Sequence, residues 1–212
     1  MALCEMTQLF IDLDGTLLIN QKRFESLLLD ISQLKQIEIK DFIKYKKLGL
    51  SNIQILSQYY KYDSDALEDF KNKWFEKIEE KQFLIKDSLV EGVKEWLRNV
   101  PKNTELILCT ARQNRNNLLW QLNYLEIASS FSRVVITYGN PMKHSFISEI
   151  ELQANDKSWF IGDSVEDVKS GKLLGLKTCA VLSGYALLND IKNCSPNLII
   201  KDITDFDISN LL

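Results

Sequence analysis

Eight positions that bear on chemistry share one property, which is that each stands in the segment following a short apolar run. They are Asp12, Asp14, Thr110, Ala111, Arg112, Lys143, Asp163 and Asp167. Carboxylates act as nucleophiles, as proton donors and acceptors and as ligands of hard cations, whereas hydroxyl groups and cations hold anions. Asp12 and Asp14 are spaced i, i+2, and Gly15 gives the backbone the freedom to turn so that both address one site. The sequence therefore predicts an acidic site that handles a small anion.

Several of these positions also have an ordinary structural explanation. Asp14 followed by Gly15 is typical of a turn, Asp163-Ser164 and Thr110 are typical of helix caps, and Lys143 is typical of an exposed surface. These explanations do not account for four acids, a hydroxyl and a lysine at the same end of successive strands. Four converging carboxylates repel one another unless a hard cation is bound, and oxygen ligands favour Mg²⁺.

The elements that position these residues are predicted from apolar runs that alternate with amphipathic segments. The runs have strand length and stand at residues 9–11, 106–109, 134–136, 159–161, 179–182 and 198–200. Helix-sized segments separate most of them, such as residues 114–125. Strands that are apolar throughout and joined by helices predict an α/β fold with a Rossmann-like, mainly parallel sheet and helices on both faces. Ligands of such sheets bind beyond the carboxyl ends of the strands, where the eight positions stand.

The stretch after the first apolar run differs, because its apolar residues recur at the helical period of 3.6. Such faces run over residues 24–34 and 67–78, and Asp63 and Ser64 are candidate N-caps of the second. We therefore predict an α/β core domain that is interrupted, directly after its first strand, by an all-helical cap domain. The core comprises residues 1–18 and 87–212, and the cap comprises residues 19–86.

Composition and charge exclude several classes of protein. The chain has 212 residues, of which 45% are hydrophobic, and a formal charge of −3. This content is too hydrophobic for a disordered chain, and the charge argues against binding to nucleic acid or to an anionic membrane. We expect no secretory leader from the first residues, and no run approaches the ~18 apolar residues of a membrane span. Because the cysteines at 4, 109, 179 and 194 are widely separated, we expect reduced thiols, no zinc framework and a cytoplasmic protein.

In the order of its motifs, the chain resembles the haloacid dehalogenase-like hydrolase superfamily. The motifs are Asp12-Leu13-Asp14-Gly15-Thr16, then Thr110 after a strand, then Lys143, then Gly162-Asp163-Ser164 with Asp167. The resemblance covers about residues 7–17 and 88–200, and the helical stretch resembles the cap that family members insert after the first motif. By this layout the chain is similar to the phosphoglycolate phosphatase and β-phosphoglucomutase branch.

The resemblance implies a Mg²⁺-dependent phosphatase that acts on a small phosphorylated metabolite. Asp12 would attack the phosphorus and form an aspartyl phosphate, and Asp14 would act as proton donor and acceptor. The residues implied to bind the phosphoryl group or the rest of the substrate are Thr110, Ala111, Arg112 and Lys143. Those implied to hold Mg²⁺ are Asp12, Asp163, Asp167 and, through its backbone carbonyl, Asp14.

Several questions stay open on the sequence alone. Asp14 favours phosphoryl transfer over dehalogenation, since dehalogenases lack an acid at this position, but a phosphomutase or phosphotransferase keeps the same acids. A catalytically silent binding module of the same fold is a third hypothesis. The substrate is not determined. Arg112 either contacts the leaving group or pairs with an acid, and Lys46 and Lys47 are candidates for substrate contact or for a phosphonatase-like Schiff base. Both a monomer and a homodimer are compatible with the sequence.

Overall fold

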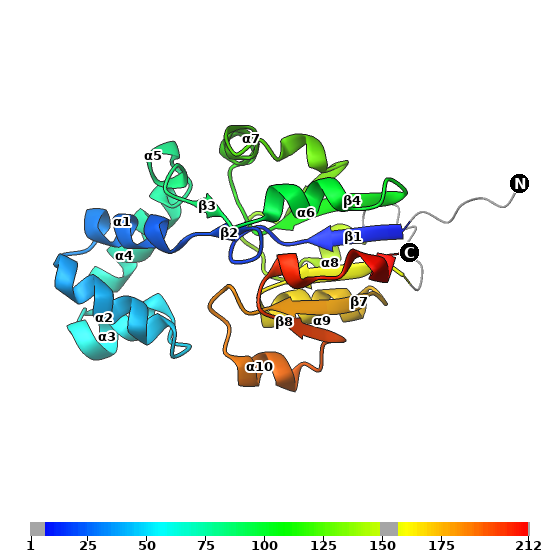
Figure 1. The fold of residues 1–212 in the computed structure, drawn as a ribbon. Coiled ribbons are helices and arrows are strands. Elements are labelled where there is room, and N and C mark those ends of the chain that lie inside the picture. Colours follow the sequence, from blue (N-terminus) through cyan, green and yellow to red (C-terminus); the bar gives the residue numbers. More distant parts are fainter. Residues whose placement is uncertain (1–6, 149–156, 212) are drawn as a thin grey trace, which may run out of the picture. The chain divides into compact units, whose positions relative to one another are not determined.

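The computed structural model describes residues 7–148 and 157–211, which divide into two compact units (Figure 1). The core unit contains the chain up to Ile19 and from Leu89 onward, and the helical unit is Asn20–Ser88. The sequence predicts the inserted segment at residues 19–86, and the structure divides the chain at 20–88. Each unit folds around hydrophobic clusters of its own.

The core unit is built on a six-stranded parallel sheet with the strand order β5-β4-β1-β6-β7-β8. Its strands are β1 (Thr7–Ile11), β4 (Thr104–Thr110), β5 (Arg133–Ile136), β6 (Trp159–Gly162), β7 (Lys177–Val181) and β8 (Leu198–Ile200). Each strand overlaps one of the six apolar runs. The predicted α/β fold class with a mainly parallel sheet is therefore confirmed.

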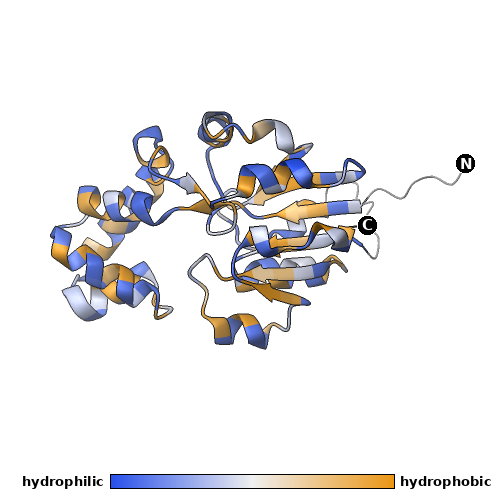
Figure 2. Ribbon diagram, viewed as in Figure 1, coloured by the Kyte–Doolittle hydropathy of each residue, from blue (hydrophilic) through white to orange (hydrophobic). Residues whose placement is uncertain are grey.

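Side chains of the central strands alternate between the two faces of this sheet. On β1, Leu9 and Ile11 join one hydrophobic cluster, whereas Phe10 joins a second cluster on the opposite face. β6 repeats the alternation, with Ile161 in the first cluster and Phe160 in the second. Because both faces are buried, these strands carry unbroken apolar sequences, and Figure 2 shows the strands as largely hydrophobic.

Helices cover both faces, as the sequence predicts. The elements that pack with Leu9 and Ile11 are α6 (Val93–Asn99), α7 (Arg115–Tyr124) and the short 3-10 helices Ala128–Ser130, Ile203–Asp205 and Ile208–Leu211. Those on the face of Phe10 are α8 (His144–Ile147), α9 (Val165–Leu173) and α10 (Leu188–Asn193).

The helical unit consists of five helices. They are α1 (Gln21–Ile31), α2 (Gln36–Lys46), α3 (Asn52–Tyr60), α4 (Ser64–Lys77) and α5 (Lys81–Leu84). Asp63 caps α4 as predicted, because its carboxylate accepts the N–H of Ala66 at 2.9 Å. The turn between α2 and α3 uses the left-handed backbone of Gly49, with φ of 86°. Leu28, Phe42 and Phe70 lie in the main apolar cluster of this unit.

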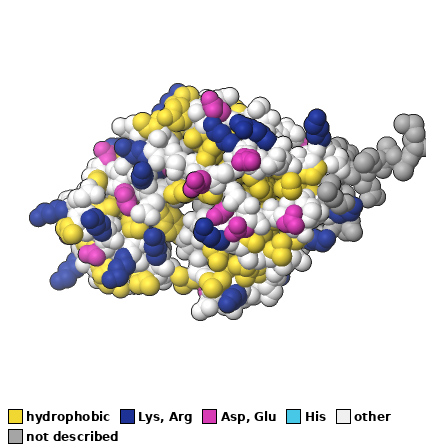
Figure 3. Space-filling view, viewed as in Figure 1, with side chains coloured by type: hydrophobic (Ala, Val, Ile, Leu, Met, Phe, Trp, Pro, Cys, Tyr) yellow, Lys and Arg dark blue, Asp and Glu magenta, His cyan; other side chains and the backbone are white. Residues whose placement is uncertain are grey.

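The chain passes from the core unit into the helical unit at the end of β2 (Leu18–Ile19) and returns within β3 (Ser88–Leu89). These two short strands pair with each other. On the face that Figure 3 shows, acidic and basic side chains of the described residues are interspersed in both units. None of the described helices combines the length and the apolar character that crossing a membrane requires.

Candidate active site

Asp12 stands where the central strand β1 leaves the sheet. β1 is buried over its whole length between β4 and β6, and the N–H of Asp12 still donates to the carbonyl of Ile161 on β6 at 2.9 Å. Gly15 then adopts a left-handed φ of 85°, which turns the chain. The Thr16 hydroxyl donates to Oδ2 of Asp12 at 3.2 Å. The strand and the turn therefore hold the Asp12 carboxylate, which is buried, at the carboxyl edge of the sheet.

Lys143 reaches the same carboxylate from the loop after β5. This loop is tied to the segment after β4, because the N–H of Gly139 donates to the carbonyl of Ala111 at 2.9 Å. Lys143 is buried, and its Nζ donates to Oδ1 of Asp12 and, at 2.6 Å, to Oδ1 of Asp167. One ammonium group thus holds two carboxylates that come from different elements.

Asp167 is fixed by the N-terminus of α9. Ser164 is the N-cap of this helix: its hydroxyl oxygen accepts the N–H of Asp167 at 3.1 Å, and the Asp167 carboxylate accepts the N–H of Ser164 at 3.1 Å. The Ser164 hydroxyl also contacts Oδ2 of Asp167 at 2.6 Å. Gly162 leaves room for this arrangement, since a Cβ at that position would overlap the Asp167 carboxylate. The helix cap and the acidic site therefore use the same residues.

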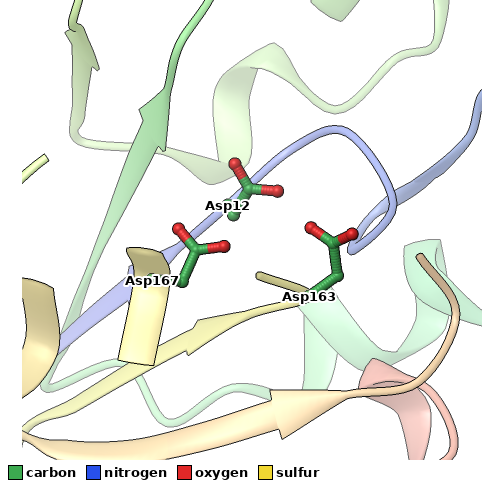
Figure 4. A group of neighbouring side chains, drawn as sticks. All are labelled: Asp12, Asp163 and Asp167. Carbon is green, nitrogen blue, oxygen red and sulfur yellow. The ribbon is translucent and has the colours of Figure 1, made fainter. Parts of the chain in front are cut away.

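Three carboxylates meet at this edge of the sheet. Asp12, Asp163 and Asp167 each offer one oxygen, and these oxygens all lie within 4.8 Å of one another. Figure 4 shows them coming from the end of β1, the end of β6 and the first turn of α9. Burial raises the pKa of Asp12 from 3.8 to about 7, against the lowering effect of Lys143 and with a further rise from Asp167. Burial and the neighbouring carboxylates of Asp12 and Asp167 likewise raise the pKa of Asp163 well above its usual value.

The charges of this cluster do not balance. Burial by itself lowers the pKa of Lys143, but Asp12 and Asp167 raise it more, so the lysine stays protonated. Its single positive charge faces three carboxyl groups, so without a further cation their full ionisation is opposed by burial and repulsion, as the raised pKa values of Asp12 and Asp163 show. Carboxylate oxygens are hard ligands of the type that Mg²⁺ binds, and the donor set therefore fits a divalent cation.

Asp14 lies apart from this cluster, in contact with Arg112. The Arg112 guanidinium donates from Nε to Oδ2 of Asp14 at 2.5 Å and from Nη2 to Oδ1 at 2.9 Å. Such a two-point contact fixes the orientation of a carboxylate as well as its position. The sequence left the role of Arg112 open, and the structure shows that it pairs with Asp14. Thr110 is buried at the end of β4, and its hydroxyl oxygen lies 3.4 Å from the N–H of Arg112.

All eight predicted positions thus lie in the core unit, in the segments at the carboxyl edge of its sheet. Sequence reasoning gave no role to several residues that support them, namely Thr16, Ser183, Gly184 and Tyr185. Thr16 could have been predicted because it belongs to the first motif. Residues 183–185 follow an apolar run, as the other site segments do, and this position in the sequence could have indicated that they lie at the site.

Lys46 and Lys47 belong to the helical unit. Lys46 is the last residue of α2, and Lys47 is its C-cap. Burial lowers the pKa of Lys46, whereas the Lys47 side chain is exposed. A role for either lysine in substrate binding or in Schiff-base chemistry stays a prediction.

Comparison with known proteins gives consistent results at the level of the fold. The model of the haloacid dehalogenase-like hydrolase family matches residues 9–181. A solved structure from Clostridium difficile, assigned as a phosphatase, is 19% identical over 98% of this chain and 99% of its own, with a TM-score of 0.77. A predicted phosphoglycolate phosphatase from Haemophilus somnus is 18% identical over 96% of this chain and 97% of its own, with a TM-score of 0.72.

A magnesium-bound hydrolase of the haloacid dehalogenase-like family from Bacillus subtilis is also similar. It is 18% identical over 95% of this chain and 96% of its own, with a TM-score of 0.63. No curated protein sequence matches the chain. At these identities the structural likeness shows the shared fold and not a shared substrate.

Proposed function

Because this chain belongs to the haloacid dehalogenase-like hydrolase family, we propose that it hydrolyses a small phosphate monoester through an aspartyl phosphate on Asp12. The observation that carries the proposal is the setting of Asp12, whose carboxylate is buried at the carboxyl edge and held by Lys143 and Thr16. Each Asp12 oxygen accepts one of these hydrogen bonds, and a carboxylate oxygen has a second acceptor site. The carboxylate is therefore both fixed and still able to react.

The proposed reaction has two displacements at phosphorus. In the first, a carboxylate oxygen of Asp12 attacks, the bond from phosphorus to the ester oxygen breaks, and Asp14 gives its proton to the departing alcohol. In the second, Asp14 takes a proton from water, which attacks the phosphorus and releases inorganic phosphate and the Asp12 carboxylate. Asp14 ends each cycle in its starting state, so one carboxyl group serves as both acid and base.

Arg112 and Lys143 would support these steps in different ways. Arg112 donates hydrogen bonds to both oxygens of Asp14, which holds this carboxyl group in one orientation for proton transfer. Lys143 is a buried point charge beside the nucleophile, where it attracts the anionic phosphoryl group and stabilises charge that develops on it. Thr110 and the backbone at Ala111 stand at the end of the neighbouring strand and would contact the same group.

We assign the cation site to Asp12, Asp163 and the backbone carbonyl of Asp14, with Asp167 as a ligand or as the residue that orients Lys143. Mg²⁺ bound there would neutralise the repulsion between the acidic site and an anionic substrate. The proximity of the three carboxyl groups, the repulsion among them when they ionise and the magnesium bound by the similar hydrolase from Bacillus subtilis support this assignment.

Phosphate release from a panel of phosphate monoesters, with Mg²⁺ or with EDTA, tests the proposal. We expect the wild type to hydrolyse at least one ester with Mg²⁺ and none with EDTA. Asp12→Asn should lower the rate by a factor of about 10⁴ or more, because it removes the nucleophile. Asp205→Asn, which changes an exposed aspartate of the same unit, is the matched control and should keep the wild-type rate.

Two results would contradict hydrolysis through Asp12. The first is a folded wild type that releases no phosphate from any panel member, and isomerisation of a sugar phosphate without phosphate release would then indicate a mutase. The second is an Asp12→Asn protein that keeps the wild-type rate. Circular dichroism of each variant shows whether it is folded.

A further inference from the structure

The segment that follows β7 contacts the acidic site although none of its residues belongs to a predicted motif. The Ser183 hydroxyl donates to the backbone carbonyl of Gly15 at 2.6 Å, which links this segment to the turn after Asp12. The backbone N–H of Tyr185 donates to the carboxylate of Asp163. Residues 183–185, here called the β7 clamp, therefore connect two sides of the site that are far apart in the sequence.

Gly184 lies between these two contacts and packs directly against Asp163. A Cβ built on Gly184 would overlap Oδ2 and Cγ of Asp163 and would lie 2.6 Å from its Cβ. A Cβ on Gly15 would lie 2.6 Å from the same Oδ2 and 3.1 Å from Cα of Gly184. The Asp163 carboxylate thus sits against the bare backbone of two glycines. Gly184 does not have left-handed backbone, so lack of space, and not conformation, requires glycine there.

The Asp163 side chain contacts the two glycines on one side and borders a cleft on another. Asp163 is only partly buried, and it lines an open cleft of about 540 Å³ together with Glu166, Tyr185 and Asp190. Mg²⁺ requires near-octahedral geometry with oxygens at about 2.0–2.1 Å, so a small shift of one ligand weakens its binding.

We propose that the β7 clamp is a positioning element for the divalent cation, in which Gly184 and Ser183 set the place of the Asp163 carboxylate. This inference rests on the proposed function, because it presupposes that Asp163 binds Mg²⁺. It assigns to the loop after β7 a role in the selection and affinity of the cation, with no contact between Gly184 or Ser183 and the phosphoryl group.

The test measures binding of Mg²⁺ and of Ca²⁺ to the metal-free protein by isothermal titration calorimetry, so that it does not depend on turnover. Gly184→Ala should raise the Kd for Mg²⁺ by about tenfold or more, the usual effect of disturbing a residue that supports a metal ligand. The Kd for Ca²⁺ should rise less, because Ca²⁺ accepts longer bonds and variable geometry. Ser183→Ala, which removes one hydrogen bond and adds no bulk, should raise the Kd for Mg²⁺ by about threefold.

Gly175→Ala is the matched control. Gly175 stands before β7, at the end of the strand opposite to the clamp, with φ of 73° and no atom within 4 Å of an added Cβ. Alanine there strains the backbone and lowers the melting temperature without touching the site. We expect this variant to bind both cations with the wild-type Kd.

The outcomes separate the two proposals. A wild type that binds no Mg²⁺ overturns both the proposed function and the role of the clamp. A wild type that binds Mg²⁺, with Gly184→Ala and Ser183→Ala binding it equally well, overturns only the clamp. The clamp is also overturned if Gly175→Ala weakens Mg²⁺ binding as much as Gly184→Ala does. If Gly184→Ala does not fold, the Kd of Ser183→Ala decides.

Discussion

Both units of the molecule bury ionised side chains, but they balance the charges differently. In the helical unit, Arg23 of α1 pairs with Asp87, with 3.3 Å between Nε and Oδ1 and side chains that are 2% and 0% exposed. In the core unit, Lys143 faces Asp12, Asp163 and Asp167. The first contact joins one cation to one carboxylate, whereas in the second one cation faces three carboxyl groups.

We interpret the contact in the helical unit as structural and the acidic cluster in the core unit as functional. A buried pair needs both partners, because the loss of one leaves the other charged and desolvated. A cluster with more carboxyl groups than cations is destabilised by repulsion when all of its acids ionise, and a bound cation relieves that repulsion. The comparison therefore predicts opposite effects when one acid is neutralised in each unit.

The largest expected effect on stability is in the helical unit. Asp87→Asn should lower the stability of that unit by about 3–5 kcal/mol, because it removes a negative charge that contacts the buried Arg23 guanidinium. Asp163→Asn should leave the stability of the metal-free core unit unchanged or raise it, since it removes repulsion. Hydrogen exchange in EDTA, read separately on peptides from α1 and from β6, measures each unit. Equal destabilisation by the two substitutions would contradict the comparison.

The second prediction concerns Arg112. Arg112→Lys keeps the charge but loses the two-point grip on Asp14, so kcat should fall by a factor of about 10–100 while the fold is retained. Arg133→Lys is the matched control, because Arg133 pairs with Glu105 at 2.8 Å near the surface, with 38% of its side chain exposed. Its kcat should change by less than about twofold. An Arg112→Lys enzyme with the wild-type kcat would show that the pair does not serve catalysis.

The smallest effects are expected from the helix caps, one in each unit. Asp63→Ala and Ser164→Ala should each cost about 1 kcal/mol of stability in urea unfolding. Only Ser164→Ala should also lower the rate of phosphate release, by about tenfold, because Ser164 holds the Asp167 carboxylate that contacts Lys143. If both variants keep the wild-type rate, the cap at α9 is purely structural.

Much of the fold could be predicted from the sequence because it depends on local periodicity. A strand buried on both faces shows an unbroken apolar run, and a helix shows apolar residues at a period of 3.6, so each element is visible within a short window. The order of the runs and of the intervening helices then predicts a parallel sheet, whose carboxyl edge is the place of the site. The caps at Asp63 and Ser164 are local in the same sense.

The site was predicted less completely, since its members are recognised by motif but their contacts are not. The motifs named Asp12, Asp14 and Lys143, but the sequence left open whether Arg112 contacts the leaving group or pairs with an acid, and the structure shows the pair with Asp14. Residues 183–185 carry no chemical group that sequence reasoning associates with the reaction, and Gly184 acts through the absence of a side chain. Such roles depend on contacts between particular atoms, and a pattern of residue types does not specify these contacts.

The sequence by itself determined the elements, their order and the kinds of group that stand at the ends of the strands. The tertiary structure decided the partners: Lys143 meets Asp12 across 131 positions, Arg112 meets Asp14 across 98, and Ser183 meets Gly15 across 168. The physical reason is that periodicity follows from the geometry of a few consecutive residues. Contacts between distant residues follow from strand register and helix packing, which the whole chain sets together.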